Sequence, residues 1–170
     1  MVTLQYAIPS LIALVFAQIL KCVFDSLINR KISIRMLMNS GGIPSSHSAI
    51  CTALATYVGL TDGFQSPLFG FAFVLSTIVM YDAIGVRQET GKQSRILNEI
   101  LEIFEKHGRP LSFTERLNTL TGHTLAQVVA GAFFGIGVGV CYVVAVMLLN
   151  GDSLSTVLVY ILHRCLPAHW

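Results

Sequence analysis

Charged residues are scarce in this chain. They make up 12% of its 170 residues, about half of the roughly 25% that is usual in soluble domains. Hydrophobic residues make up 54%. This balance excludes an ordinary water-soluble domain and indicates a single integral membrane domain over residues 1–170. Because the backbone must satisfy its own hydrogen bonds inside lipid, we expect an all-α fold.

Three further absences narrow the class of protein. No basic residue precedes the apolar segment 4–20 and no small-residue cleavage site follows it, which favours a retained transmembrane helix over a signal peptide. No interleaving of basic and aromatic residues suggests a nucleic-acid partner. The four cysteines have no paired spacing, so neither a disulfide framework nor a metal site is predicted. They are Cys22, Cys51, Cys141 and Cys165.

The chain contains several long apolar segments. A hydrocarbon core of about 30 Å needs about 20 apolar residues in a helix, and four segments can cross it: 4–27, 44–60, 67–86 and 123–149. The second is short, so its start should lie inside the protein rather than in lipid. A last apolar piece, 154–162, is too short to span and is either interfacial or re-entrant. The sequence predicts a polytopic bundle of four spans, with this piece as a candidate fifth membrane segment.

Residues 88–122, between the third and fourth spans, hold most of the acidic side chains. Apolar residues recur there at helical spacing, which predicts an amphipathic helix inserted between the two spans. The helix either lies on the membrane as a lid over a site or packs on the end of the bundle. The apolar positions are Ile96, Leu97, Ile100, Leu101, Ile103 and Phe104.

Basic residues are unevenly distributed among the loops. Three basic residues follow the first span and six fall between the third and fourth spans. The loop between the second and third spans has no basic residue, and its one charged residue is Asp62. By the positive-inside rule, both basic loops are cytoplasmic and the N-terminus is outside. The start of span two, the end of span three and the start of span four then share the cytoplasmic face. A polar cluster lies at each of these three ends.

The first polar cluster, 41–48, combines two glycines, a proline, three serines and a histidine. With the proline in the first turn of a helix, backbone N–H groups, hydroxyls and the helix dipole would together hold a phosphate. The alternative is a flexible turn followed by an ordinary interfacial histidine. The residues concerned are Gly41, Gly42, Pro44, Ser45, Ser46 and His47.

The second cluster contains Asp82 and Arg87, followed by Lys92. An ionisable group inside an apolar span is costly unless it is paired or functional. Asp82 therefore either takes part in a site or only pairs with Arg87. Lys21, near the end of the first span, is a fourth candidate, with snorkelling to the headgroups as the alternative.

The third cluster begins the fourth span with His123, and Gln127 follows one turn later. Both lie on a stripe with three glycines, Gly131, Gly135 and Gly139. Small residues allow helices to approach closely, so the stripe should face the interior of the bundle. Glycine packing alone explains everything on this stripe except the histidine.

Two histidines beside cations and a helix N-terminus suit phosphoryl transfer without a metal or other cofactor. One imidazole can attack phosphorus while the other protonates the leaving oxygen. Cations and backbone N–H groups stabilise the charge on the remaining oxygens.

The ordered set of motifs resembles the divergent branch of the type 2 phosphatidic acid phosphatases, relatives of the vanadium haloperoxidases. The resemblance rests on 41–49, 81–87 with 91–93, and 122–131, together with Lys21. It implies that His123 is the nucleophile that becomes phosphohistidine. It also implies that His47 is the general acid.

The chain departs from the superfamily pattern at three places. The arginine expected seven residues after Lys21 is Ile28, and the arginine expected six residues before His123 is Leu117. Arg87 could supply this charge from another helix. The aspartate expected four residues after His123, which orients the nucleophile, is Gln127. An amide can orient an imidazole but cannot stabilise an imidazolium as a carboxylate does.

The sequence therefore predicts a membrane phosphatase that acts on a lipid phosphate or diphosphate from the cytoplasmic leaflet. His123 and His47 are the catalytic residues. The phosphate would be held by Lys21, Ser45, Ser46, Arg87 and Lys92. Asp82, Gln127, Gly41 and Gly42 would support them.

Two other classes of function remain open at this stage. One is a non-catalytic binder or transporter of lipid phosphate, favoured by Gln127. The other is a phosphotransferase that uses a divalent metal, which needs several clustered carboxylates around Asp82. The partner in each case is a membrane lipid, and a homo-oligomer is compatible with the sequence.

Overall fold

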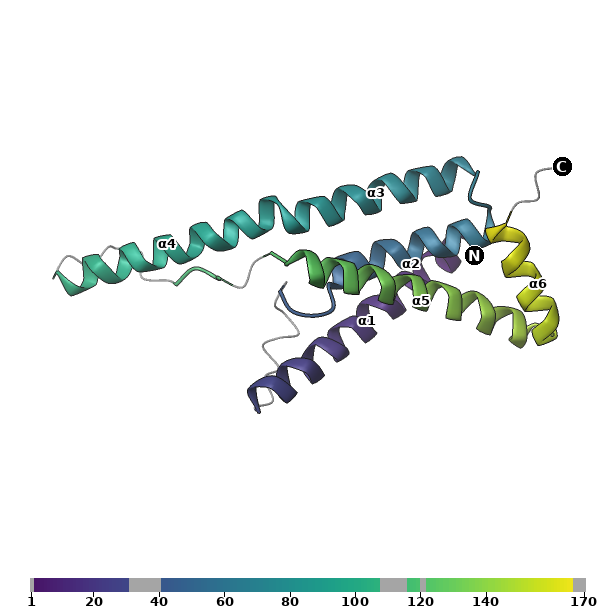
Figure 1. Cartoon of the computed structure of the whole chain (residues 1–170), viewed down its shortest axis with the longest axis horizontal. Helices are drawn as coiled ribbons and strands as arrows, with labels where there is room; N and C mark the ends of the chain where they lie inside the picture. The colour runs from purple at the N-terminus through teal and green to yellow at the C-terminus, as the bar shows by residue number, and fades with distance from the viewer. Residues whose placement is uncertain (1, 31–40, 108–115, 120–121, 167–170) are drawn as a thin grey trace.

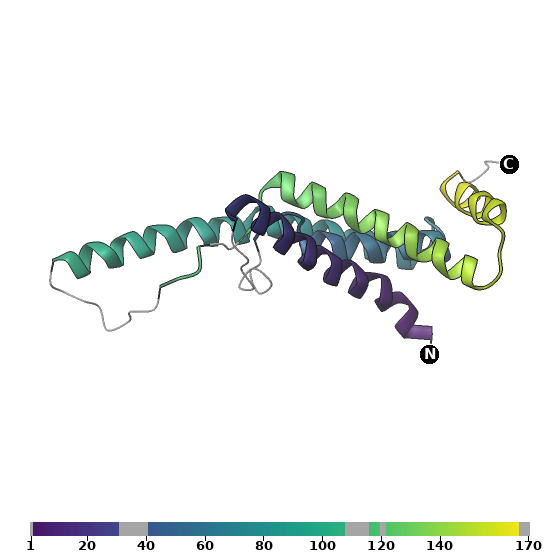
Figure 2. The same cartoon turned by 90° about the horizontal axis from the view of Figure 1, so that it is seen from below.

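The structure, a computed structural model, describes residues 2–30, 41–107, 116–119 and 122–166. It is an all-helical bundle (Figures 1 and 2). Its helices, in chain order, are α1 (Val2–Asn29), α2 (Ser46–Thr61), α3 (Pro67–Ile84), α4 (Val86–Lys106), α5 (Leu125–Leu149) and α6 (Leu154–Cys165). The predicted spans agree with α1, α2, α3 and α5 to within about two residues at each end, which is the usual uncertainty of a helix boundary.

Helix α2 is the centre of the bundle. It packs against α1, α3 and α5, and its small side chains Ala49 and Ala53 are completely buried. Three other helices are long and apolar enough to cross a membrane, whereas α2 has only 16 residues. At about 1.5 Å per residue it is roughly 24 Å long. Its first turn is buried at Ser46, which confirms that this span starts inside the protein.

A glycine stripe brings α5 against α2. A Cβ atom added at Gly131, Gly135 or Gly139 would collide with α2, in the first two cases with its backbone. The hydroxyl of Thr52 spans the contact, since it donates to the carbonyl oxygen of Ala132 at 3.0 Å. The structure thus confirms that the stripe faces the interior.

We expect Gly135→Val to destabilise the bundle by about 1–3 kcal/mol, because the added methyl groups overlap the α2 backbone. Thermal unfolding of the purified protein in detergent measures the effect. Gly137→Val is the matched control on the same helix, because a Cβ at Gly137 meets no atom within 4 Å. Equal losses in the two variants would contradict the close contact between α5 and α2.

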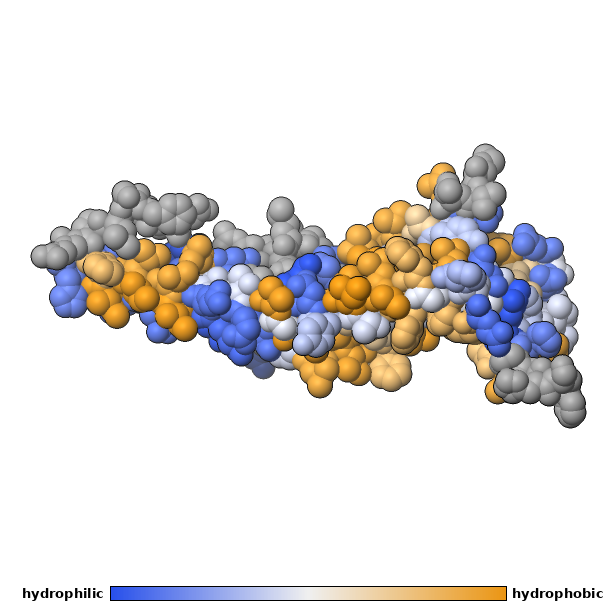
Figure 3. Space-filling model, turned by 90° about the horizontal axis from the view of Figure 1, so that it is seen from above, coloured by the Kyte–Doolittle hydropathy of each residue, from blue (hydrophilic) through white to orange (hydrophobic). Residues whose placement is uncertain are grey.

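Helix α4 continues the direction of α3 beyond the bundle (Figure 1). Among the described elements it packs on no helix other than α3. Its apolar side chains, including Ile96 and Ile103, are exposed. Figure 3 shows them as a second hydrophobic area, separated from the bundle by a mostly hydrophilic band. The predicted amphipathic helix is therefore present, but it neither covers the candidate site nor packs on the end of the bundle.

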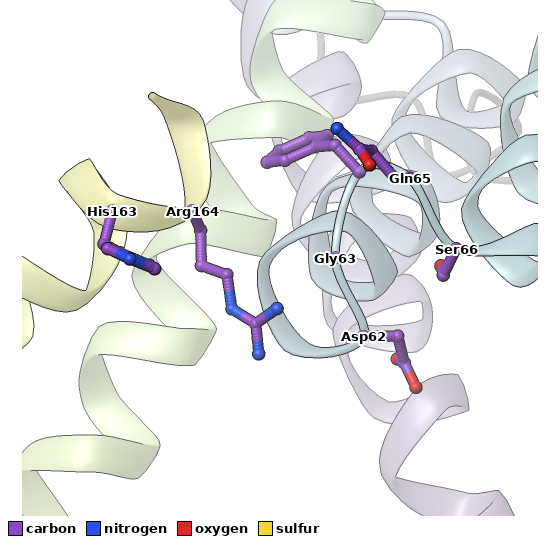
Figure 4. A pocket seen from close by; sticks show the side chains of 7 residues that line it. Asp62, Gly63, Gln65, Ser66, His163 and Arg164 are labelled. Atoms are coloured by element: carbon purple, nitrogen blue, oxygen red, sulfur yellow. The ribbon is translucent and has the colours of Figure 1, made fainter. Parts of the chain in front are cut away.

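Helix α6 crosses the opposite end of the bundle (Figures 1 and 2). The Tyr160 hydroxyl donates to the carbonyl oxygen of Leu60 at 2.8 Å, and Arg164 donates to that of Thr61 at 2.9 Å. Figure 4 shows Arg164 reaching from α6 toward the turn at Asp62 and Gly63. The polar pocket there, of about 580 Å³, thus lies where α6 is fastened over the ends of α2 and α3.

Candidate functional site

The three polar clusters meet at the end of the bundle remote from α6. The start of α2, the end of α3 and the start of α5 lie together there (Figures 1 and 2). The Ser45 N–H donates to the carbonyl oxygen of Gln127 at 3.1 Å, and the His123 N–H donates to that of Ala83 at 3.0 Å. These two backbone hydrogen bonds join α5 to α2 and to α3, so they fix the loops that carry both histidines.

His47 and His123 face each other although they are 76 positions apart. Their ring centroids are 6.0 Å apart and the rings are inclined at 76°. His123 is 1% exposed, and neither of its ring nitrogens has a hydrogen-bond partner among the described residues. Buried polar atoms are normally satisfied. Two unsatisfied nitrogens on one buried ring therefore mark a place where a ligand could bind.

Arg87 connects the second cluster to the first. Its Nε donates to Asp82 Oδ2 at 2.5 Å, and its Nη1 lies 3.0 Å from His47 Nε2. Asp82 and Arg87 thus form the ion pair that was one of the two alternatives in the sequence. The pair involves the Arg87 Nε, so the Nη1 group is still available to His47. Because a guanidinium can only donate, His47 Nε2 accepts, and a neutral imidazole then carries its proton on Nδ1. That Nδ1 is buried and has no partner among the described residues.

Lys21 is buried at the same site. It is 1% exposed, so its side chain does not snorkel to the headgroups. Its charge acts on His123, which in the structure lies just before the spanning helix Leu125–Leu149 and not in its first turn as predicted. Burial lowers the pKa of the His123 imidazole to about 4, and the charge of Lys21 acts in the same direction. At neutral pH this imidazole is uncharged, as a nucleophile must be.

The loop before α2 differs in register from the prediction. Pro44 is not in the first turn, because α2 begins at Ser46 and Ser45 is its N-cap. The Ser45 hydroxyl accepts from the Ser48 N–H at 3.4 Å, as hydroxyls at this position do. Ser45 and Ser46 are both buried, and the first turn still offers N–H groups without helical partners.

Two glycines of this loop can be placed. Gly41 is buried. Gly42 has a φ of 106°, a conformation that side chains rarely allow. Gly42 thus gives this loop a turn that other residues would resist, and the supporting role of both glycines stays a prediction.

The Gln127 side chain makes no hydrogen bond with the His123 ring, both of whose nitrogens lack a partner among the described residues. Its Oε1 accepts from the Thr124 N–H at 3.1 Å, and its own N–H donates to Thr124 Oγ1 at 3.3 Å. This reciprocal pair is a capping box that closes the first turn of α5. The support that Gln127 gives comes instead from its carbonyl oxygen, which accepts from Ser45.

Lys92 lies outside the cluster. Its Nζ is 2.6 Å from Glu89 Oε1 on α4, and both side chains are more than half exposed. The structure thus brings together Lys21, Ser45, Ser46, Asp82, Arg87 and the two histidines, and it does not bring Lys92 to them. Among the residues that the structure describes, no three His, Cys, Asp or Glu side chains are grouped so that they could hold a metal ion.

Two features of the site were not predicted. The Ala83 carbonyl oxygen holds the backbone of His123, a contact that no residue type indicates. Ser48 is completely buried, and its hydroxyl oxygen has no partner among the described residues. Its place in the Ser-Ser-His-Ser string was the available signal. It adds one more hydroxyl beside His47.

Comparisons with known proteins show a family for this chain. The family described as "Divergent PAP2 family" matches residues 3–138. The chain is also 33% identical over 138 residues to the "Uncharacterized membrane protein YuiD" of Bacillus subtilis (strain 168). The aligned region covers 76% of this chain and 87% of that protein. No solved structure matches. The family match includes all the clustered residues and ends before α6.

Proposed function

This chain belongs to the divergent PAP2 family, and on that basis we propose that it is an integral membrane phosphatase for a lipid phosphate or diphosphate. One observation carries the proposal: two histidines from separate elements face each other, and three of their four ring nitrogens are buried without partners among the described residues. Uncommitted imidazole nitrogens beside the buried Lys21 and the partly exposed Arg87 suit the transfer of a phosphoryl group.

In the proposed reaction, a ring nitrogen of His123 attacks phosphorus. Before this step the bound phosphate takes over the Arg87 Nη1 donor from His47 Nε2, and His47 takes up a proton from solvent to react as the imidazolium. A nitrogen–phosphorus bond forms as the bond from phosphorus to the leaving oxygen breaks, and His47 Nδ1 gives one proton to that oxygen and is left as a neutral imidazole. A water molecule then attacks the phosphohistidine and returns a proton to His47, which releases phosphate. Throughout, Lys21 and Arg87 neutralise the phosphate oxygens.

The first turn of α2 completes the proposed phosphate cradle. Its N–H groups and the buried hydroxyls of Ser45 and Ser46 lie at the positive end of the helix dipole, where anions are stabilised. Asp82 keeps Arg87 in place through their ion pair. Each of these groups comes from a rigid helix end, which favours precise positioning of the substrate.

A lipid substrate is favoured by the surroundings of the site. The helices that carry it expose large apolar side chains, such as Phe71 at 70% and Phe133 at 71%, as a surface in contact with lipid does. The distribution of basic residues favours a cytoplasmic site with the N-terminus outside. A reporter enzyme that is active on only one side of the membrane, fused before Val2, tests this orientation.

Phosphate release from a panel of lipid phosphates tests the proposed activity. Purified protein in detergent is expected to hydrolyse at least one of phosphatidic acid, phosphatidylglycerol phosphate, polyprenyl phosphate and polyprenyl diphosphate. A phosphohistidine should be trapped during turnover as an acid-labile phosphorylated protein. Absence of phosphate release from the whole panel would contradict the proposal.

The second candidate function is binding or transport of a lipid phosphate without catalysis. The observation in its favour is that neither of two nearby polar side chains orients the His123 ring. The Gln127 amide caps α5, and the Asp82 carboxylate is paired with Arg87. A nucleophilic imidazole without an orienting carboxylate is weaker. This candidate predicts binding of lipid phosphate by the purified protein with no turnover.

A further inference from the structure

We propose that an apolar groove between α3 and α5 holds one hydrocarbon chain of the lipid phosphate and limits its length, with α6 as the closed end. The inference rests on the proposed function, because it concerns the substrate of the same site. The groove has a volume of about 440 Å³ and an almost wholly apolar lining. Pockets that bind small molecules are of this size and character.

The groove begins next to the candidate site on three helices. Its lining includes Thr52 on α2, Met80 on α3 and Ala132 on α5. Thr52 lies one helical turn after Ser48 on α2, and Met80 lies two residues before Asp82 on α3. Ala132 follows Gly131, whose backbone packs directly against Ser45. A phosphate held between the histidines would therefore have the mouth of the groove directly beside its ester oxygen.

At the opposite end of the groove, Phe64 and Phe69 meet edge to face, with ring centroids 5.0 Å apart and ring planes inclined at 76°. Ile161 of α6 also lines this part of the groove, and together these side chains would form its closed end. From Met80 to Phe69 the groove follows eleven residues of α3, about 16 Å. One leaflet of a hydrocarbon core of about 30 Å is roughly 15 Å deep. The groove therefore matches the chain of a lipid in one leaflet.

A second apolar groove lies on another face, and its shape fits this role less well. It has a volume of about 620 Å³ and is lined by α1 and α5 residues, among them Phe16 and Phe133. It takes no residue from α2 or α3, the helices that carry His47 and Asp82. It also takes no residue from α6. Of these two grooves, the one between α3 and α5 reaches from the helices of the site to α6, which could limit chain length.

Photocrosslinking tests where the chain lies without requiring turnover. The probe is dodecyl phosphate with a diazirine at the end of its chain, bound to the full-length wild-type protein and to His123→Ala. Crosslinks are expected on peptides that contain Phe64, Phe69 or Ile161. Crosslinks concentrated on the α1 residues Ile12 and Phe16, or no crosslinking that excess unlabelled probe removes, would overturn the proposal.

Chain-length profiles test the limit. Hydrolysis of butyl, octyl, dodecyl and hexadecyl phosphate is compared among variants. We expect KM to fall about fourfold for each methylene that the groove buries, up to a fixed length. Val140→Phe, two turns of α5 beyond Ala132 in the same groove, should shorten that length, and Phe69→Ala should extend it. Gly137→Leu, which fills the other groove, should leave the profile unchanged.

Photocrosslinking and the chain-length profiles together distinguish a failure of the proposed phosphatase activity from a failure of the groove assignment. If no alkyl or lipid phosphate is hydrolysed, the proposed phosphatase activity fails, and the crosslinking result alone decides the groove. If the enzyme is active but its profile is flat, or shifts with Gly137→Leu and not with Val140→Phe, the groove assignment fails and the phosphatase stands. A thermal melt of each variant identifies any that does not fold.

Discussion

Replacing His123 with alanine is expected to reduce phosphate release from the lipid substrate by at least about a thousandfold, because removal of a nucleophile abolishes the covalent step. The ring is 1% exposed and both its nitrogens are free of partners among the described residues, so no neighbouring group replaces it. Initial rates of phosphate release from the best substrate of the panel measure the effect.

His163→Ala is the matched control for this substitution. His163 is exposed on α6 and lines the polar pocket at the other end of the bundle, so its removal should change the rate little. The phosphohistidine should also disappear in His123→Ala while binding of the lipid phosphate persists. Full activity in His123→Ala would contradict the mechanism, and binding without turnover in the wild-type protein would favour the non-catalytic candidate.

The helices of the bundle could be predicted from the sequence because lipid imposes a simple rule on it. Long apolar runs end at charged or polar residues, and these ends are the helix boundaries at Leu27, Pro67 and Leu149. The glycine stripe could also be predicted, since glycines spaced four residues apart share one face of a helix.

The direction of α4 could not be predicted from the sequence. It depends on the backbone at Gly85, where φ is −100° and ψ is −96°, and no residue pattern specifies those angles.

The membership of the site could be predicted, but its internal contacts could not. Charge distribution among the loops was enough to bring His47, Asp82 and His123 to one end of the bundle. The contact between Arg87 and His47 joins residues 40 positions apart, and its geometry depends on how the junction between α3 and α4 lies against the start of α2. For a related reason, the sequence suggested that the Gln127 side chain orients His123, whereas in the structure it caps α5 through Thr124. A capping box competes for its amide, and local hydrogen bonding prevails over the longer reach to His123.

Arg87 is expected to be the residue whose loss costs most after the nucleophile. Arg87→Ala should lower kcat/KM by about a hundredfold to a thousandfold, the usual effect of removing a group that stabilises charge in the transition state. The substitution also leaves Asp82 without its ion-pair partner and His47 Nε2 without its donor. Arg87→Lys should recover only part of the loss, because one ammonium group cannot reproduce two directed contacts from a planar fork. Rates on the same lipid phosphate measure both.

Arg95→Ala removes the same charge from the same helix at an exposed position, so it separates loss of a specific contact from loss of net positive charge. If Arg87 acts through His47 as well as on phosphate, the effects of Arg87→Ala and His47→Ala should be far from additive, because groups that work as a unit share one contribution. Additive effects would assign Arg87 to phosphate binding alone. An Arg87→Ala rate equal to that of Arg95→Ala would remove it from the site, since its contact with His47 would then have no part in the reaction.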